Sequence, residues 1–220
     1  MCGRYTLVDP RSLANRYARF RFPKQIAASF NVAPTDPVVA LCDDRGDEAE
    51  TMEWGFPAPE AGAATRRIVN ARSETVADKP MFRESFAAQR CIVFADGYYE
   101  WMTDGRHKRP FYFTIDGGTP FAFAGLWMND GPKRVCCLLT TTPNEVQARV
   151  HDRSPVILAD DEKIDRWLAR STLDELRSLL VPVEAARTSA REVSARVNSV
   201  RVNDASCLAP AEPDRSLPLF

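Results

Sequence analysis

Metal-binding residues are scarce in this sequence. It contains two histidines, and none of its six cysteines forms a Cys-x-x-Cys pair. Because zinc sites are usually assembled from such cysteines and histidines, we expect no metal and no other cofactor. A thiol such as Cys91, inside the apolar segment CIVFA, is expected to be a reduced core residue.

Targeting and membrane-spanning segments are also missing. Residues 1–20 contain four arginines and lack the apolar centre of a signal peptide, and nowhere do 18 apolar residues follow one another. We therefore expect a cytoplasmic protein that does not span a membrane. Nothing in the sequence indicates an obligate dimer, so a monomer is expected.

The sequence lacks an excess of positive charge. Its 29 Lys and Arg residues against 30 Asp and Glu residues give a formal net charge of -1. A domain that binds nucleic acid over a wide surface is usually strongly basic. If this chain binds DNA, it must therefore use a local basic groove.

Apolar residues are abundant and occur in short runs. They make up 45% of the 220 residues, which is enough to bury the core of one large domain. Runs rich in Val, Ile, Phe and Thr predict strands. The predicted strands are Tyr5–Val8, Val38–Cys42, Met52–Phe56, Cys91–Ala95, Phe111–Ile115, Phe121–Leu126, Val135–Thr141 and Val156–Leu158. A hairpin turn is expected at Gly117-Gly118, between two of them.

Helical patterns are fewer than strand patterns. They cover Asp9–Arg19, residues 80–90, Asp160–Ala169 and Thr172–Leu180, and the last of these begins with a capping-box pattern. Strands and helices do not alternate as in parallel α/β folds, so the sequence predicts a β-rich α+β fold. We expect one domain over residues 1–206 and an irregular tail over residues 207–220.

The second residue, Cys2, is a candidate nucleophile. A small residue at this position normally permits removal of the initiator methionine, which would leave an α-amine beside the thiol. Their ordinary pKa values, about 7.7–8.0 and about 8.5, make both groups partly nucleophilic near neutral pH. Together they can convert an aldehyde into an imine and then into a thiazolidine ring. The alternative is that Cys2 is an ordinary residue of a frayed terminus.

Two titratable residues are candidates for proton transfer. Glu100 lies between Tyr99 and Trp101, and burial there would raise the pKa of its carboxyl group. An ion pair with an arginine is the structural alternative. His151 begins the segment HDRSPVIL and is a candidate general acid, or else a histidine that caps a loop at the surface.

Polar and aromatic residues elsewhere suggest a binding surface. Asn70 could hold a substrate hydroxyl and Arg72 a phosphate group, although Asn70 is also a good helix N-cap. Pro34, Trp54 and Trp101 are candidate supports for unstacked bases. Such apolar residues are otherwise expected in the core.

Several of these segments occur together in a known order. They are MCGRYTL at 1–7, FNVAPT at 30–35, EWGF at 53–56, VNARSET at 69–75, CIVFADGYYEW at 91–101, TTTPN at 140–144 and HDRSPVIL at 151–158. This set resembles the SRAP family, the SOS-response-associated peptidase or abasic-site-processing proteins. The resemblance implies a β-rich domain with a barrel-like mixed sheet, flanking helices and one cleft.

The resemblance also implies roles for individual residues. Cys2 would form the crosslink, and Asn70 would orient its amine or the opened sugar. Glu100 would transfer protons, and His151 would assist imine formation and ring opening.

The substrate implied by the resemblance is an abasic site in single-stranded DNA. Arg4, Arg72 and Arg153 match family positions near phosphate groups. The product would be a thiazolidine crosslink formed through a Schiff base, which can also lead to β-elimination and hence to lyase activity. No base pairing must be broken to reach an abasic site in a single strand.

Two other functions remain open from the sequence. The older family name suggests a thiol peptidase, in which Cys2 is the nucleophile and His151 and Glu100 support it, or which removes its own Met1. A non-covalent module that binds single-stranded DNA is the third possibility. Such a module would bind DNA equally well with alanine at position 2.

Overall fold

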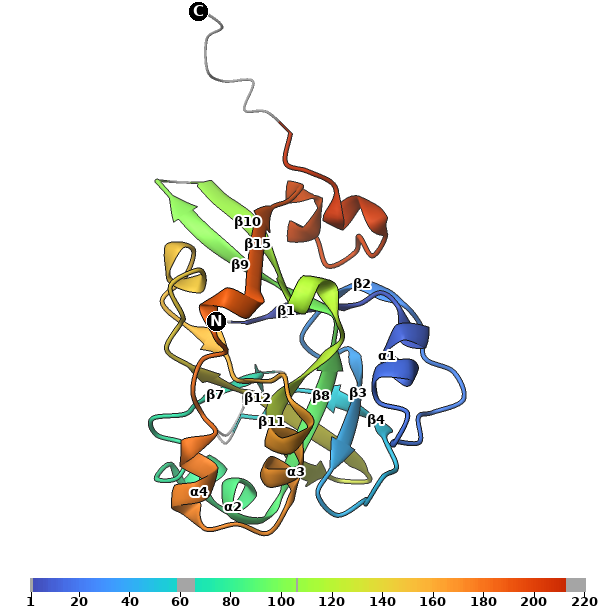
Figure 1. Ribbon diagram of the computed structural model, residues 1–220, viewed down its shortest axis with the longest axis vertical. Helices are drawn as coiled ribbons and strands as arrows, with labels where there is room; N and C mark the ends of the chain where they lie inside the picture. Colours follow the sequence, from blue (N-terminus) through green and yellow to red (C-terminus); the bar gives the residue numbers. More distant parts are fainter. Residues whose placement is uncertain (1, 59–65, 106, 213–220) are drawn as a thin grey trace, which may run out of the picture.

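The computed structural model describes residues 2–58, 66–105 and 107–212 (Figure 1). Met1 and residues 213–220 of the predicted tail lie outside the described residues. Fifteen strands are described: β1 Arg4–Leu7, β2 Ser29–Val32, β3 Pro37–Cys42, β4 Glu50–Trp54, β5 Phe56–Pro57, β6 Arg67–Ile68, β7 Asn70–Arg72, β8 Arg90–Ala95, β9 Gly97–Asp104, β10 His107–Ile115, β11 Phe121–Asp130, β12 Lys133–Thr141, β13 Ser154–Pro155, β14 Ile157–Leu158 and β15 Thr188–Glu192. The α-helices are α1 Pro10–Arg16, α2 Pro80–Ala88, α3 Asp161–Leu168 and α4 Leu173–Ser178.

A closed barrel forms the centre of the fold. Its strands follow one another in the order β12-β4-β3-β8-β11, and β11 pairs with β12 to close the ring. The sheet is mixed because β12 runs parallel to β4 and to β7, whereas its pairing with β11 is antiparallel. The expected α+β fold with a barrel-like mixed sheet and flanking helices is thus confirmed.

A second sheet lies against the barrel and holds the amino terminus. Its strand order is β15-β10-β9-β1-β2, so β1 has a neighbour on each side (Figure 1). In the antiparallel pair β1–β9, Arg4 lies opposite Tyr99 and Tyr5 opposite Tyr98. Continuing this register by one residue brings Gly3 beside Glu100. The first residues of the chain are therefore fixed beside the middle of β9.

Helices α2 and α3 cover one end of the barrel and meet at a buried arginine. Arg90 begins β8, and only 2% of it is exposed. Its guanidinium donates hydrogen bonds to the last carbonyl groups of α2 and α3. The acceptors are the oxygens of Phe86 (3.1 Å), Ala87 (2.7 Å), Trp167 (2.8 Å) and Ala169 (2.9 Å). One side chain thus caps two helix C-termini.

Local sequence patterns fail where long-range contacts decide the structure. The first helix ends at Arg16 rather than Arg19, because Tyr17 turns into the core and packs on Phe94. The hairpin expected at Gly117-Gly118 is wrong, since β10 and β11, on either side of this turn, belong to different sheets. The capping box of α4 is confirmed.

No helix among the described residues is long and apolar enough to cross a membrane.

Ordered structure continues beyond residue 206, where the irregular tail was expected to begin. Cys207 is fully buried in a 3-10 turn over Ala205–Leu208, and Pro210 bridges to Val193. Cys207 Sγ donates a hydrogen bond to Val202 O. This segment packs against the second sheet, which holds it in place.

Replacing Arg90 with methionine is expected to lower the free energy of unfolding by about 3–5 kcal/mol. The methionine keeps the length of the side chain but leaves the helix carbonyls without their donor. It also removes the positive charge that lies 3.5 Å from the Asp43 carboxylate. Chemical denaturation measures the change. Arg83→Met, on the exposed face of α2, should change stability by less than about 0.5 kcal/mol. A loss below about 1 kcal/mol in Arg90→Met would contradict this role.

Candidate functional site

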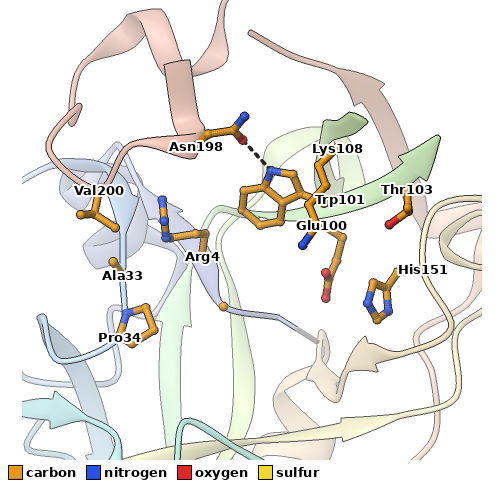
Figure 2. A pocket seen from close by; sticks show the side chains of 11 residues that line it. Arg4, Ala33, Pro34, Glu100, Trp101, Thr103, Lys108, His151, Asn198 and Val200 are labelled. Carbon is orange, nitrogen blue, oxygen red and sulfur yellow. Dashed lines mark hydrogen bonds between the residues drawn. The ribbon is translucent and has the colours of Figure 1, made fainter. Parts of the chain in front are cut away.

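A pocket of about 820 Å³ opens where the amino-terminal residues and residues 198–200 meet strand β9. Figure 2 shows Glu100 and His151 on one side of it and Pro34 and Val200 on the other. Arg4 and Trp101 lie between them. Residues distant in the sequence thus line one cavity with acidic, basic and apolar groups.

Cys2 directly precedes Gly3, which lines this pocket, and is fully buried. Burial raises the pKa of its thiol well above the usual value, and the nearby charge of Glu100 raises it further. Asn70 Nδ2 donates a 2.7 Å hydrogen bond to Cys2 O, while Asn70 Oδ1 is buried and has no hydrogen-bond partner among the described residues. Asn70 therefore fixes the Cys2 backbone and keeps an acceptor for a further polar group.

Glu100 supplies a carboxyl group at the floor of the pocket. Its side chain projects from β9, and 3% of the residue is exposed. Burial raises its pKa to about 7, because desolvation disfavours the charged form. At neutral pH both protonation states are therefore populated, which suits a group that accepts and returns a proton.

His151 faces the same pocket from the loop before β13. Its backbone N–H donates to Gln147 O (3.0 Å), which continues the 3-10 turn Gln147–Arg149. Burial lowers the pKa of the imidazole, so the ring is neutral at pH 7. The sequence-predicted residues Cys2, Asn70, Glu100 and His151 are thus brought together, although they come from four separate segments.

The three arginines expected near phosphate groups differ in their surroundings. Arg4 lines the pocket, with Nη1 bonded to Asn31 Oδ1 and Val197 O, both at 2.8 Å. Arg72 is exposed and stands two residues after Asn70 on β7, so their side chains share a face of the strand. The side chain of Arg153 is 13% exposed and forms an ion pair with Glu74.

The aromatic candidates divide into one pocket residue and one core residue. Trp101 lines the pocket, where its Nε1 donates to Asn198 Oδ1 (2.7 Å) and Arg4 lies over its ring (Figure 2). Trp54 is fully buried and its Nε1 donates to Val69 O (3.0 Å). The prediction that Trp54 supports a base is corrected, because a side chain inside the barrel cannot reach DNA.

Sequence reasoning missed the wall formed by the carboxyl-terminal segment. Asn198 and Val200 line the pocket, and Val200 is 58% exposed, which is unusual for a large apolar residue of this chain. Buried Asn31 holds the segment, because its Nδ2 donates to Ser199 O (3.0 Å) and Val202 O (2.7 Å). The sequence offered one signal for this wall, which was the asparagine Asn31 within the segment FNVAPT.

Metal coordination finds no support in the part of the chain that is described. Within it, no group of three or more His, Cys, Asp or Glu residues is placed to hold a metal ion. All six cysteines are buried free thiols.

Replacing Glu100 with glutamine is expected to stabilise the fold at alkaline pH. A folded pKa near 7, above the ordinary 4.5, means that wild-type stability is fully present below about pH 4.5 and declines as the pH rises through 7. Glutamine removes this decline, so the variant should exceed wild type by about 1–3 kcal/mol at pH 8 and by little at pH 4.5. Denaturation at both pH values measures this. Exposed Glu84→Gln is the control, and equal pH dependence in Glu100→Gln and wild type would contradict the raised pKa.

Comparison with known proteins identifies the family of this chain. The family model described as SOS response associated peptidase (SRAP) matches residues 1–200. The chain is 36% identical over 222 residues to the abasic site processing protein YoaM of Bacillus subtilis, covering 94% of this chain and 97% of that protein. It is 27% identical to the abasic site processing protein YedK of Escherichia coli, covering 96% and 100%. A solved structure from Bacteroides thetaiotaomicron shares the fold with a TM-score of 0.83 at 24% identity, covering 96% of this chain and 100% of that one. The chain therefore belongs to the SOS response associated peptidase (SRAP) family.

Proposed function

We propose that this protein captures abasic sites in single-stranded DNA as a covalent thiazolidine crosslink, through the α-amine and thiol of Cys2 after removal of Met1. The observation that carries the proposal is the placement of Cys2. Asn70 holds its carbonyl group at 2.7 Å, and a carboxyl group with a pKa of about 7 lies close enough to influence the thiol. Relatives named abasic site processing proteins support the choice of substrate.

The first chemical step joins the α-amine to the sugar aldehyde. The deoxyribose of an abasic site is mostly a closed hemiacetal, so its ring must open by transfer of the hydroxyl proton to the ring oxygen. His151 and Glu100 face the pocket and can exchange these protons. The amine nitrogen then adds to the carbonyl carbon, and the loss of water leaves a Schiff base.

The second step closes the thiazolidine ring. The sulfur adds to the imine carbon, and the thiol proton is transferred to the nitrogen, so that no oxidant or reductant is needed. Because burial keeps the Cys2 thiol protonated, the amine reacts first and the thiol follows with transfer of its proton. Glu100 would accept this proton and return it to the nitrogen.

The pocket also suits an unpaired DNA strand. Arg4 and Arg72 supply positive charge for phosphate groups, which positions the strand without reading its sequence. Trp101 and Pro34 offer apolar surface for the bases that flank the lesion. Local charge of this kind fits a protein whose net charge is -1.

Two further activities follow from the same residues. The Schiff base is the intermediate from which β-elimination could break the strand, which would be lyase activity. Removal of Met1 by the protein itself would be a single-turnover peptidase activity. Hydrolysis of other proteins by Cys2 is less well supported, because the hydrogen bond of its buried Sγ goes to Arg4 O at 3.9 Å and its thiol is held protonated.

Replacing Cys2 with serine should separate the two steps. Serine and alanine both allow removal of Met1 and keep the α-amine, but neither has a thiol to close the ring. We expect wild type to give a heat-stable adduct with a labelled oligonucleotide on a denaturing gel without reductant. Cys2→Ser and Cys2→Ala should give an adduct only when borohydride reduces the imine. An oligonucleotide with a tetrahydrofuran residue, which has no aldehyde, is the control. A heat-stable adduct of Cys2→Ser without reductant would refute ring closure.

Replacing Arg72 with alanine should weaken binding of single-stranded DNA several-fold. One lost phosphate contact is expected to reduce the slope of log affinity against log salt concentration by about 0.7. Fluorescence anisotropy at several salt concentrations measures both quantities. Exposed Arg83→Ala on α2 has the same change of charge and should leave them unaltered. If Arg72→Ala matched Arg83→Ala, Arg72 would lie outside the path of the strand.

A further inference from the structure

Tyr98 is a buried titratable residue that the proposed reaction does not use. It lies on β9 two residues before Glu100, so the two side chains share one face of the strand. Its ring is fully buried and stacks on Phe113, with 5.0 Å between the ring centroids. Burial raises the pKa of the phenol well above its usual value, so the hydroxyl group keeps its proton at neutral pH and can donate it in a hydrogen bond.

The Tyr98 hydroxyl binds the turn that leads to His151. Gln147 Nε2 donates to Tyr98 Oη at 2.5 Å, and only 2% of Gln147 is exposed. The other end of the amide fixes its orientation, because Gln147 Oε1 accepts from the backbone N–H of Asn144 at 3.0 Å. The backbone of Gln147 in turn carries His151, since Gln147 O accepts from His151 N at 3.0 Å. One buried residue thus joins the phenol to the His151 backbone.

The same hydroxyl also reaches the far side of the His151 loop. Ser154 begins β13 three positions after His151, is 1% exposed, and forms a side-chain hydrogen bond with Tyr98. Ser154 Oγ donates to Pro155 O at 3.1 Å, so its lone pairs are available to the phenol O–H. Because the Tyr98 oxygen accepts from Gln147, its own hydrogen is left for this contact. One side chain of β9 therefore holds the loop at both ends.

We propose that Tyr98 is a positioning residue that fixes the distance between His151 and Glu100. Strand β9 carries Glu100, and the hydroxyl two residues earlier on the same face anchors the loop that carries His151. Two groups that exchange protons with one substrate must both stay within hydrogen-bond reach of it. This inference rests on the proposed function for its kinetic consequence, whereas the anchoring of the loop can be tested without DNA.

The alternative is that Tyr98 and Gln147 merely satisfy each other in the core. Tyr98→Phe leaves buried Gln147 Nε2 without its acceptor, which should lower the midpoint of chemical denaturation. The double variant Tyr98→Phe/Gln147→Met removes both polar groups, and half-buried Asn144 can bind water instead, so most of this loss should be recovered. A core role predicts that the reaction rate recovers with stability, whereas a positioning role predicts that it does not.

The first test follows the His151 loop without DNA, through the imidazole Hε1–Cε1 signals in ¹H–¹³C NMR spectra. The chain has two histidines, so the signals are assigned with His107→Gln. Wild type is expected to give one narrow signal for His151, because the loop is held in a single arrangement. Tyr98→Phe and the double variant should both give a broadened or doubled signal. A narrow His151 signal in the double variant would overturn the proposal.

The second test is the rate of adduct formation at saturating DNA. Loss of the fixed spacing should lower this rate about tenfold in Tyr98→Phe and by as much in the double variant. The dissociation constant for a strand that carries a tetrahydrofuran residue should stay within about twofold of wild type, because fully buried Tyr98 cannot touch DNA. A rate that recovers together with the denaturation midpoint in the double variant would refute the positioning role.

Tyr17→Phe provides the matched control. Tyr17 is 1% exposed and also buries its phenol, but it lies at the end of α1 and its hydroxyl has no hydrogen-bond partner among the described residues. This variant should keep both the narrow His151 signal and the wild-type rate. If wild type itself formed no adduct, the proposed function would fail, while the NMR comparison would still decide whether Tyr98 holds the loop.

Discussion

The antiparallel pairing of β1 with β9 decides where the amino terminus of this protein lies. Arg4 opposite Tyr99 fixes the register, and the residues before Arg4 must then run beside Glu100 into the interior. A shift of one residue would turn every side chain of β1 to the other face. The burial of Cys2, its contact with Asn70 and the closeness of Glu100 all follow from this one pairing.

Burial beside the middle of β9 also sets the protonation states of the site. It raises the pKa values of the Cys2 thiol and the Glu100 carboxyl group and lowers that of His151, because a charged form is disfavoured in each case. The site therefore holds mainly neutral groups that can exchange protons. For the proposed reaction, this favours addition of the amine followed by ring closure over attack by a preformed thiolate.

Much of this organisation could be predicted from local sequence, and the remainder depends on contacts between distant segments. Apolar runs identified most barrel strands, and Thr172 with Glu175 identified the capping box of α4. The sequence could not show that Trp54 points into the barrel, since an aromatic beside a glycine suits a loop as well as a core. It could not show that Arg153 pairs with Glu74, because the two residues lie 79 positions apart in the chain.

The most direct test of covalent capture is the intact mass of the protein after reaction with a single-stranded oligonucleotide that carries one abasic site. The account predicts one product whose mass equals the protein without Met1 plus the oligonucleotide minus one water, because imine formation releases water and ring closure releases nothing. Peptide mapping should place the DNA on Cys2. Protein that lacks Met1 but remains entirely unmodified, or an adduct at another residue, would contradict the account.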